Sequence, residues 1–126
     1  METISYMVIP ALSKSAFFNG RVVGGVTLNQ MERMRLCDRI IESTCIVCGI
    51  TPDEIARKSR DRKLVEARYI VWNACKEKMP YITQKELGLL FNKDHSTVVY
   101  ALKQLPILME QDEGLAELYR RVIQSL

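Results

Sequence analysis

The apolar residues between positions 29 and 48 recur at steps of three and four, which is the spacing of one face of an α-helix. Gly49 follows this stretch, and glycine often ends a helix because it adopts a left-handed backbone conformation at little cost. The pattern therefore predicts a helix over residues 29–48. Its apolar stripe consists of Met31, Met34, Cys37, Ile40, Ile41, Cys45 and Cys48.

The segment TPDE, which comes next, has the residue types of a helix N-terminus. Thr51 is the expected N-cap, Pro52 is the first helical residue, and Glu54 completes a capping box with Thr51. Together they predict a short helix that ends near Arg57.

A long helix is predicted from residue 61 or 62 to Met79. Pro80 ends it, because the residue before a proline disfavours the helical conformation. Trp72 is expected at the edge of the buried stripe of this helix. The stripe consists of Leu64, Val65, Ala67, Ile70, Val71, Ala74, Cys75 and Met79.

Two helices separated by a short turn are predicted after Pro80. The segment TQKE opens the first, of about two turns, with Thr83 as its cap and Glu86 as the partner of that cap. The turn is FNKD, in which Asn92 can adopt the left-handed conformation. The second helix starts at residues 94–96, and Pro106 is expected to interrupt or end it. The apolar residues of the pair are Leu87, Leu89, Leu90, Phe91, Val98, Val99, Ala101, Leu102 and Leu105.

A last amphipathic helix is predicted over residues 112–124, whereas residues 1–28 have little helical periodicity. Within residues 16–23, the pair Asn19-Gly20 lies between apolar residues and favours a hairpin with a type I′ turn. A flexible arm is the alternative for this segment. The apolar side of the last helix consists of Leu115, Leu118, Tyr119, Val122 and Ile123.

These elements predict an all-α fold, a compact bundle of about six helices that includes a helix-turn-helix. We expect residues 29–126 to form this helical domain and residues 1–28 to form a non-helical arm or small hairpin. A length of 126 residues is typical of one domain and is enough to bury a core.

The composition, 48% hydrophobic and 26% charged, is that of an ordinary globular protein. No apolar run approaches the roughly 18 residues that a membrane span needs, so no membrane partner is expected. The first residues lack a basic region ahead of the apolar ones, which argues against a signal peptide. We therefore expect a cytoplasmic location.

Four cysteines raise the question of a metal or redox site, because Cys45 and Cys48 form a CxxC pair. A zinc site needs further ligands, and only Cys37, Cys75 and His95 remain for that purpose. Cys45 and Cys48 also lie at helical spacing in an apolar stretch, which favours core packing over metal or redox chemistry. We expect reduced thiols, no metal and no cofactor.

The charge of the chain is concentrated in one stretch. Residues 57–63, RKSRDRK, contain five basic residues and one acidic residue, whereas the whole chain has a net charge of only +3. A solvated basic loop and a phosphate-binding patch are both consistent with this run.

The short helix, turn and second helix around residue 92 form the pattern of a helix-turn-helix. In that motif the second helix enters the major groove and its first residues contact base edges. Asp94 can accept from cytosine, the methyl of Thr97 can contact thymine, and His95 and Ser96 can donate or accept. The alternative is that these are an ordinary helix cap and surface residues.

Three segments resemble the DNA-binding C-terminal domain of the bacterial replication initiator DnaA. They are KSRDRKLVEARYIVW (58–72), KELGLLF (85–91) and DHSTVVYAL (94–102), and the likeness extends over roughly residues 35–126. The resemblance implies a six-helix, Trp-repressor-like domain that binds a short asymmetric double-stranded site, the DnaA box.

The resemblance also implies contacts for individual residues. Asp94, His95 and Ser96 would contact bases in the major groove, and Thr97 would contact bases or the adjacent backbone. Arg60 would enter the minor groove, with Arg62 as the alternative. Together with the charge pattern, the likeness predicts phosphate contacts from Arg57, Lys58, Arg62, Lys63, Lys76, Lys78, Thr83, Gln84, Lys85 and Lys93.

The chain departs from the family pattern in three ways. The register of the basic loop is ambiguous by one or two residues, so Arg60 and Arg62 compete for the minor-groove role. The turn before Asp94 is one residue shorter, and Lys93 stands where the family has an arginine, whose bidentate fork lysine cannot supply. The family's ATPase module is not expected, since no GxxxxGK[ST] motif occurs.

The leading hypothesis is a stand-alone protein that binds double-stranded DNA of the DnaA-box type. It would regulate replication initiation or transcription, or compete for sites. The alternative is a helical protein–protein interaction adaptor, with residues 1–28 contacting a protein partner or a second copy. No enzyme is expected, because the only histidine lacks a nucleophile and an orienting partner.

Overall fold

The computed structural model describes residues 28–126, which form six helices and no strand. This confirms the all-α expectation for the described part of the chain. The hairpin predicted within residues 16–23 lies outside the described residues, so it stays a prediction. The helices are α2 (Leu28–Cys48), α3 (Pro52–Ala56), α4 (Arg62–Lys78), α5 (Gln84–Leu89), α6 (His95–Gln111) and α7 (Glu113–Gln124).

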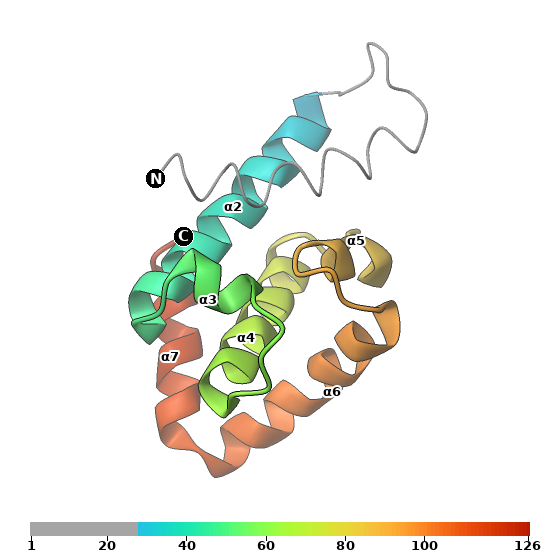
Figure 1. The fold of residues 1–126 in the computed structure, drawn as a ribbon. Helices are drawn as coiled ribbons and strands as arrows, with labels where there is room; N and C mark the ends of the chain where they lie inside the picture. The colour runs from blue at the N-terminus through green and yellow to red at the C-terminus, as the bar shows by residue number, and fades with distance from the viewer. Residues whose placement is uncertain (1–27) are drawn as a thin grey trace.

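Helix α4 lies at the centre of the bundle, where it packs against α2 and α6 (Figure 1). Helix α7 closes one side by packing against both α2 and α6, while α5 packs against the first part of α6. Within residues 28–126, none of the helices has the length and apolar character that crossing a bilayer requires.

The predicted caps between α2 and α4 are present. Gly49 ends α2 with a φ of 70°, and the Ile50 N–H donates to the Cys45 carbonyl over 3.0 Å. The Thr51 hydroxyl accepts from the Glu54 N–H, and the Glu54 carboxylate accepts from the Thr51 N–H in return. Because each signal is local, these helix ends were predictable from a few residues of sequence.

Trp72 corrects one expectation. It was placed at the edge of the α4 stripe, but it is 1% exposed and is among the largest fully buried side chains. Its indole N–H donates to the Leu87 carbonyl over 2.8 Å, and its ring packs against Phe91 with centroids 5.7 Å apart. A buried indole needs such a partner, and Leu87 supplies it from 15 residues away in the chain.

The turn between α5 and α6 is a tight backbone structure. Asn92 has a φ of 55°, as predicted, and the Lys93 N–H donates to the Gly88 carbonyl over 2.8 Å. The Asn92 N–H approaches the Leu89 carbonyl, so the two bonds form the Schellman pattern that ends many helices. A Cβ on Gly88 would lie only 2.4 Å from the Lys93 carbonyl oxygen. This close approach leaves room for glycine alone.

Pro106 corrects a second expectation. It was predicted to interrupt or end the helix, yet α6 runs through it from residue 95 to residue 111. Proline removes one backbone hydrogen bond and crowds the preceding turn. Leu105 is fully buried, and Leu108 and Met109 pack against the core on the far side of the proline. Burial on both sides of Pro106 offsets the local preference, which a single residue cannot reveal.

The final helix begins as predicted. The Asp112 carboxylate accepts from the Leu115 N–H over 3.1 Å and caps α7. Leu115 and Val122 are buried, and the Tyr119 hydroxyl donates to the Glu77 carboxylate over 2.6 Å, which ties α7 to the end of α4.

We expect Gly88→Ala to lower the free energy of unfolding by about 1–3 kcal/mol, because the new methyl group meets backbone rather than a flexible side chain. Urea denaturation measures this change. Gly114→Ala is the matched control, since its Cβ would approach only the end of the Asp112 side chain at 3.2 Å. Equal stability for the two variants would contradict the close approach.

Pro106→Ala should raise the free energy of unfolding by roughly 1–3 kcal/mol. Position 106 is exposed, so no packing is lost, while the helix regains a backbone hydrogen bond and a residue of high helix propensity. Thermal or urea unfolding tests this, and a loss of stability would mean that the proline is needed for the course of α6.

Candidate nucleic-acid interface

The start of α6 presents four consecutive polar side chains to solvent. Asp94, His95, Ser96 and Thr97 are all exposed. The Asp94 carbonyl accepts from the Thr97 and Val98 N–H groups and so begins the helix. The residues predicted to contact bases therefore lie on an open surface at a helix N-terminus.

Asp94 occupies the N-cap position, but its side chain makes no capping hydrogen bond of standard geometry. Its carboxylate instead accepts from the Ser96 hydroxyl over 2.7 Å and lies 3.4 Å from His95 Nδ1. The Ser96 hydrogen bond, together with the backbone N–H groups at the helix start, lowers the pKa of Asp94. Asp94 is thus an ionised, exposed acceptor held by its own neighbours.

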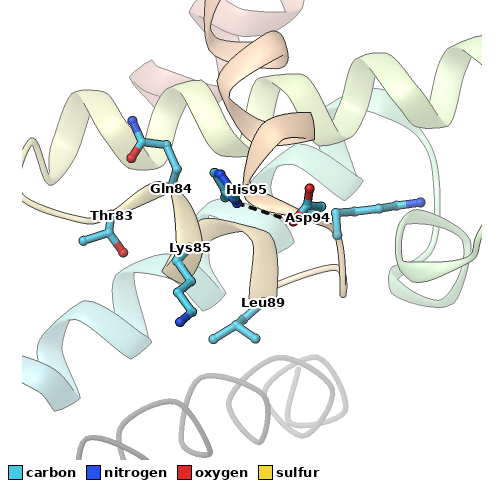
Figure 2. A pocket seen from close by; sticks show the side chains of 7 residues that line it. Thr83, Gln84, Lys85, Leu89, Asp94 and His95 are labelled. Carbon is cyan, nitrogen blue, oxygen red and sulfur yellow. Dashed lines mark ion pairs between the residues drawn. The ribbon is translucent and has the colours of Figure 1, made fainter.

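A pocket lies between α5 and the start of α6 (Figure 2). Side chains from α5 stand on one side of it, with Asp94 and His95 on the other. Lys85 is exposed and Gln84 is partly buried. The Thr83 hydroxyl accepts from the Glu86 N–H and caps α5. The lining residues are Thr83, Gln84, Lys85, Leu89, Lys93, Asp94 and His95.

Lys93 lies between this pocket and the basic residues of segment 57–63. Partial burial lowers the pKa of its ammonium group. The neighbouring charges of Arg68, Lys58 and Arg60 lower it further, because each of them disfavours another cation nearby. The loop between α3 and α4 therefore lies close to the turn before α6, although more than thirty residues separate them in sequence. Lys58 and Arg60 are both exposed there.

The basic residues of segment 57–63 do not form one patch. Arg62 is paired with Glu66 over 3.0 Å and lines a second pocket with Gln111 and Asp112 at the end of α6. Since α6 has 17 residues, its two ends are about 25 Å apart at 1.5 Å per residue. Arg62 thus lies far from His95, and the fold brings only part of the run to the start of α6.

The remaining predicted phosphate contacts differ in their surroundings. Arg57, Lys63 and Lys78 are exposed. Lys63 lies near the Cys48 thiol. Burial raises the pKa of this thiol, and the charge of Lys63 offsets part of that increase. The Lys76 ammonium donates to the Ile82 carbonyl over 2.6 Å and so holds the segment between α4 and α5.

Arg68 was not among the predicted site residues. Its side chain is only 4% exposed and donates to three backbone carbonyls of α3 and the basic loop. The sequence contained a signal for it, because Arg68 falls four residues after Leu64 and three before Val71, on the buried stripe of α4. A cation at a buried helix position indicates a specific partner.

Arg33 was also missed. It pairs with the Glu86 carboxylate over 3.4 Å, and its guanidinium lies 5.6 Å from the centre of the Tyr81 ring. Glu86 also accepts from the Thr83 N–H in the capping box of α5. One carboxylate therefore joins α2 to the cap of α5, a contact between residues more than fifty positions apart.

The cysteines lie in the body of the bundle. Cys37, Cys45 and Cys75 are buried and Cys48 is partly exposed. Burial is the main cause that raises the pKa of Cys45 to about 12. Among residues 28–126, no group of three or more His, Cys, Asp and Glu side chains is arranged to hold a metal ion.

Relatives of known description match most of this chain. The chromosomal replication initiator protein DnaA of Bacteroides thetaiotaomicron is 30% identical over 116 residues, covering 86% of this chain and 24% of the relative. The DnaA 1 protein of Chlamydia trachomatis is 25% identical over 96 residues, covering 75% of this chain and 21% of the relative. The DnaA of Thermodesulfovibrio yellowstonii is 31% identical over 88 residues, covering 69% and 20%. The chain spans a quarter or less of the length of these relatives.

The family model described as the bacterial dnaA protein helix-turn-helix matches residues 37–105. That range is more than half of the chain, and it contains α3, the basic loop, α5 and the exposed start of α6. The chain belongs to the bacterial DnaA helix-turn-helix family.

Proposed function

We propose that this domain binds double-stranded DNA sequence-specifically, at sites of the DnaA-box type, in the control of replication initiation or transcription. Membership of the helix-turn-helix family and the names of the relatives, which are replication initiators, support the proposal. The start of α6 is the reading element, and the cations around it bind the phosphates.

The chemistry of the α6 start suits base edges in the major groove. Asp94 is an ionised acceptor, which matches the amino group of cytosine. His95 and Ser96 are exposed and can donate or accept, and the exposed Thr97 has a methyl group that can contact thymine. Since all four side chains occupy the first turn, a groove that admits the helix end meets them together.

The cations near this helix end suit the phosphate backbone. Lys58 and Arg60 lie close enough to Lys93 to lower the pKa of its ammonium group, and Lys85 lines the adjoining pocket. None of these four belongs to an ion pair in the described part of the chain. Unpaired cations beside a helix N-terminus favour a bound polyanion.

Arg60 is the better candidate than Arg62 for the minor groove. Arg60 is exposed and lies near Lys93, whereas Arg62 is paired with Glu66 and lies toward the far end of α6. The single observation that carries the proposal is this meeting of an exposed polar helix start with unpaired cations from a distant loop.

The domain should bind a duplex that contains a DnaA box more tightly than a scrambled duplex of the same length and composition. Neutralising about five phosphates predicts that log K falls with log salt at a slope of roughly −4 to −5. Fluorescence anisotropy at several salt concentrations measures both quantities. Equal affinity for the two duplexes would exclude base reading. Salt-insensitive copurification with a protein, without duplex binding, would favour the adaptor alternative.

Single substitutions should separate reading from phosphate binding. His95→Ala should cost about 1–3 kcal/mol on the specific duplex and reduce its advantage over the scrambled one. Lys58→Ala should weaken both duplexes alike and reduce the salt slope by about 1.

Arg121→Ala is the matched charge control for both variants. Arg121 is exposed on α7, which Figure 1 shows on the opposite side of the bundle from α5. It should change neither the affinity nor the specificity measurably. An effect of Arg121→Ala as large as that of Lys58→Ala would mean that net charge, and not the proposed surface, determines binding.

A further inference from the structure

We propose that Arg68 is a positioning residue for DNA binding, which holds the basic loop so that Lys58 and Arg60 lie beside Lys93. The inference rests on the proposed function and assigns a role to a residue that touches no DNA itself. It accounts for a buried arginine that the helix-turn-helix does not otherwise require.

The contacts of Arg68 all go to one segment of backbone. Its Nε donates to the Ile55 carbonyl over 2.8 Å and its Nη1 donates to the Ser59 carbonyl over 3.0 Å. Its Nη2 donates to the Arg57 carbonyl. The three acceptors are alternate residues, so a single guanidinium group spans the end of α3 and the first half of the basic loop. Its planar fork fixes their relative positions.

Few other contacts hold this loop. The Ser59 N–H donates to the Arg57 carbonyl over 2.8 Å, and the Asp61 N–H donates to the Ser59 hydroxyl over 3.1 Å. In the part of the chain that the structure describes, Lys58 and Arg60 make no ion pair and no side-chain hydrogen bond. Their places are therefore set by the backbone, and Arg68 is the main side chain that orders it.

The charge of Arg68 also remains available. None of the ion pairs within residues 28–126 involves Arg68, so carbonyl dipoles alone compensate its charge. It contributes to the positive surroundings of Lys93 from inside the protein. An acidic partner for Arg68 would occupy the donors that bind these carbonyls and would also cancel the attraction for phosphate.

A double-mutant cycle between Arg68→Lys and Arg60→Ala tests the proposal in the whole chain. Lysine keeps the charge but cannot donate to three carbonyls at once. In the otherwise unchanged protein, we expect Arg60→Ala to weaken binding to the specific duplex about tenfold, which is the scale of a minor-groove contact. In the Arg68→Lys background, the same substitution should weaken binding less than about threefold, because Arg60 is no longer held in place. Arg68→Lys alone should weaken binding about tenfold and lower the salt slope by about 1.

Limited trypsin digestion provides a readout that does not involve DNA. The loop contains Arg57, Lys58 and Arg60, which are exposed cleavage sites. Arg68→Lys should increase the rate of cleavage at these sites several-fold under conditions in which the bundle remains folded by circular dichroism. If Arg68→Lys does not fold, Arg68→Met, which keeps the apolar stem of the side chain, replaces it in both experiments.

Val122→Ala is the matched control for lost stability. Val122 is fully buried in α7, away from the loop, so its truncation destabilises the bundle without touching Arg68. It should leave duplex affinity within about twofold and loop cleavage unchanged while the protein is folded. An equal effect of Arg60→Ala in both backgrounds, with unchanged cleavage, would overturn the positioning role.

The two proposals fail in distinguishable ways. If the unmodified chain binds no duplex, the proposed function and the DNA role of Arg68 both fall, whereas the cleavage assay still reports whether Arg68 orders the loop. If the unmodified chain discriminates between duplexes but the cycle shows no coupling, only the role of Arg68 is overturned.

Discussion

The arrangement of the whole surface depends on two successive carbonyls at the end of α5. The Leu87 carbonyl accepts from the buried indole of Trp72, and the Gly88 carbonyl accepts from the N–H of Lys93. The first bond fixes α5 to the central helix, and the second fixes the beginning of α6 to α5. Because Gly88 has no Cβ, the chain can turn back closely enough to make the second bond. The direction in which Asp94–Thr97 point follows from this pair of contacts.

The cations beside the start of α6 disfavour one another's charge. Lys93 is partly buried beside three other cations, an arrangement that disfavours its charge in the free protein. The Schellman turn holds the backbone of Lys93 in this place, and the hydrogen bonds of Arg68 hold the loop that carries Lys58 and Arg60. Under the proposed function, a phosphate bound beside Lys93 would stabilise its charged form, because an opposite charge nearby raises the pKa of an ammonium group.

Local chemistry made much of the fold predictable. The capping boxes at Thr51 and Thr83 and the left-handed Asn92 each depend on residues within a few positions, and all three are present. The burial of Trp72 and the passage of α6 through Pro106 depend on partners far along the chain, which periodicity does not contain. For the site, sequence located the exposed start of α6. It could not show that the basic run is divided, because that depends on how α4 crosses α6.

The carboxylate of Glu86 makes two contacts that join different helices. It completes the cap of α5, and it forms an ion pair with the guanidinium of Arg33 from α2. If the amino-terminal half of α2 moved away from the bundle, either Glu86 would be displaced with it or the ion pair between Arg33 and Glu86 would break. Thr83, which this cap holds, also lines the pocket beside His95. The position of α2 and one border of this pocket therefore share a single carboxylate.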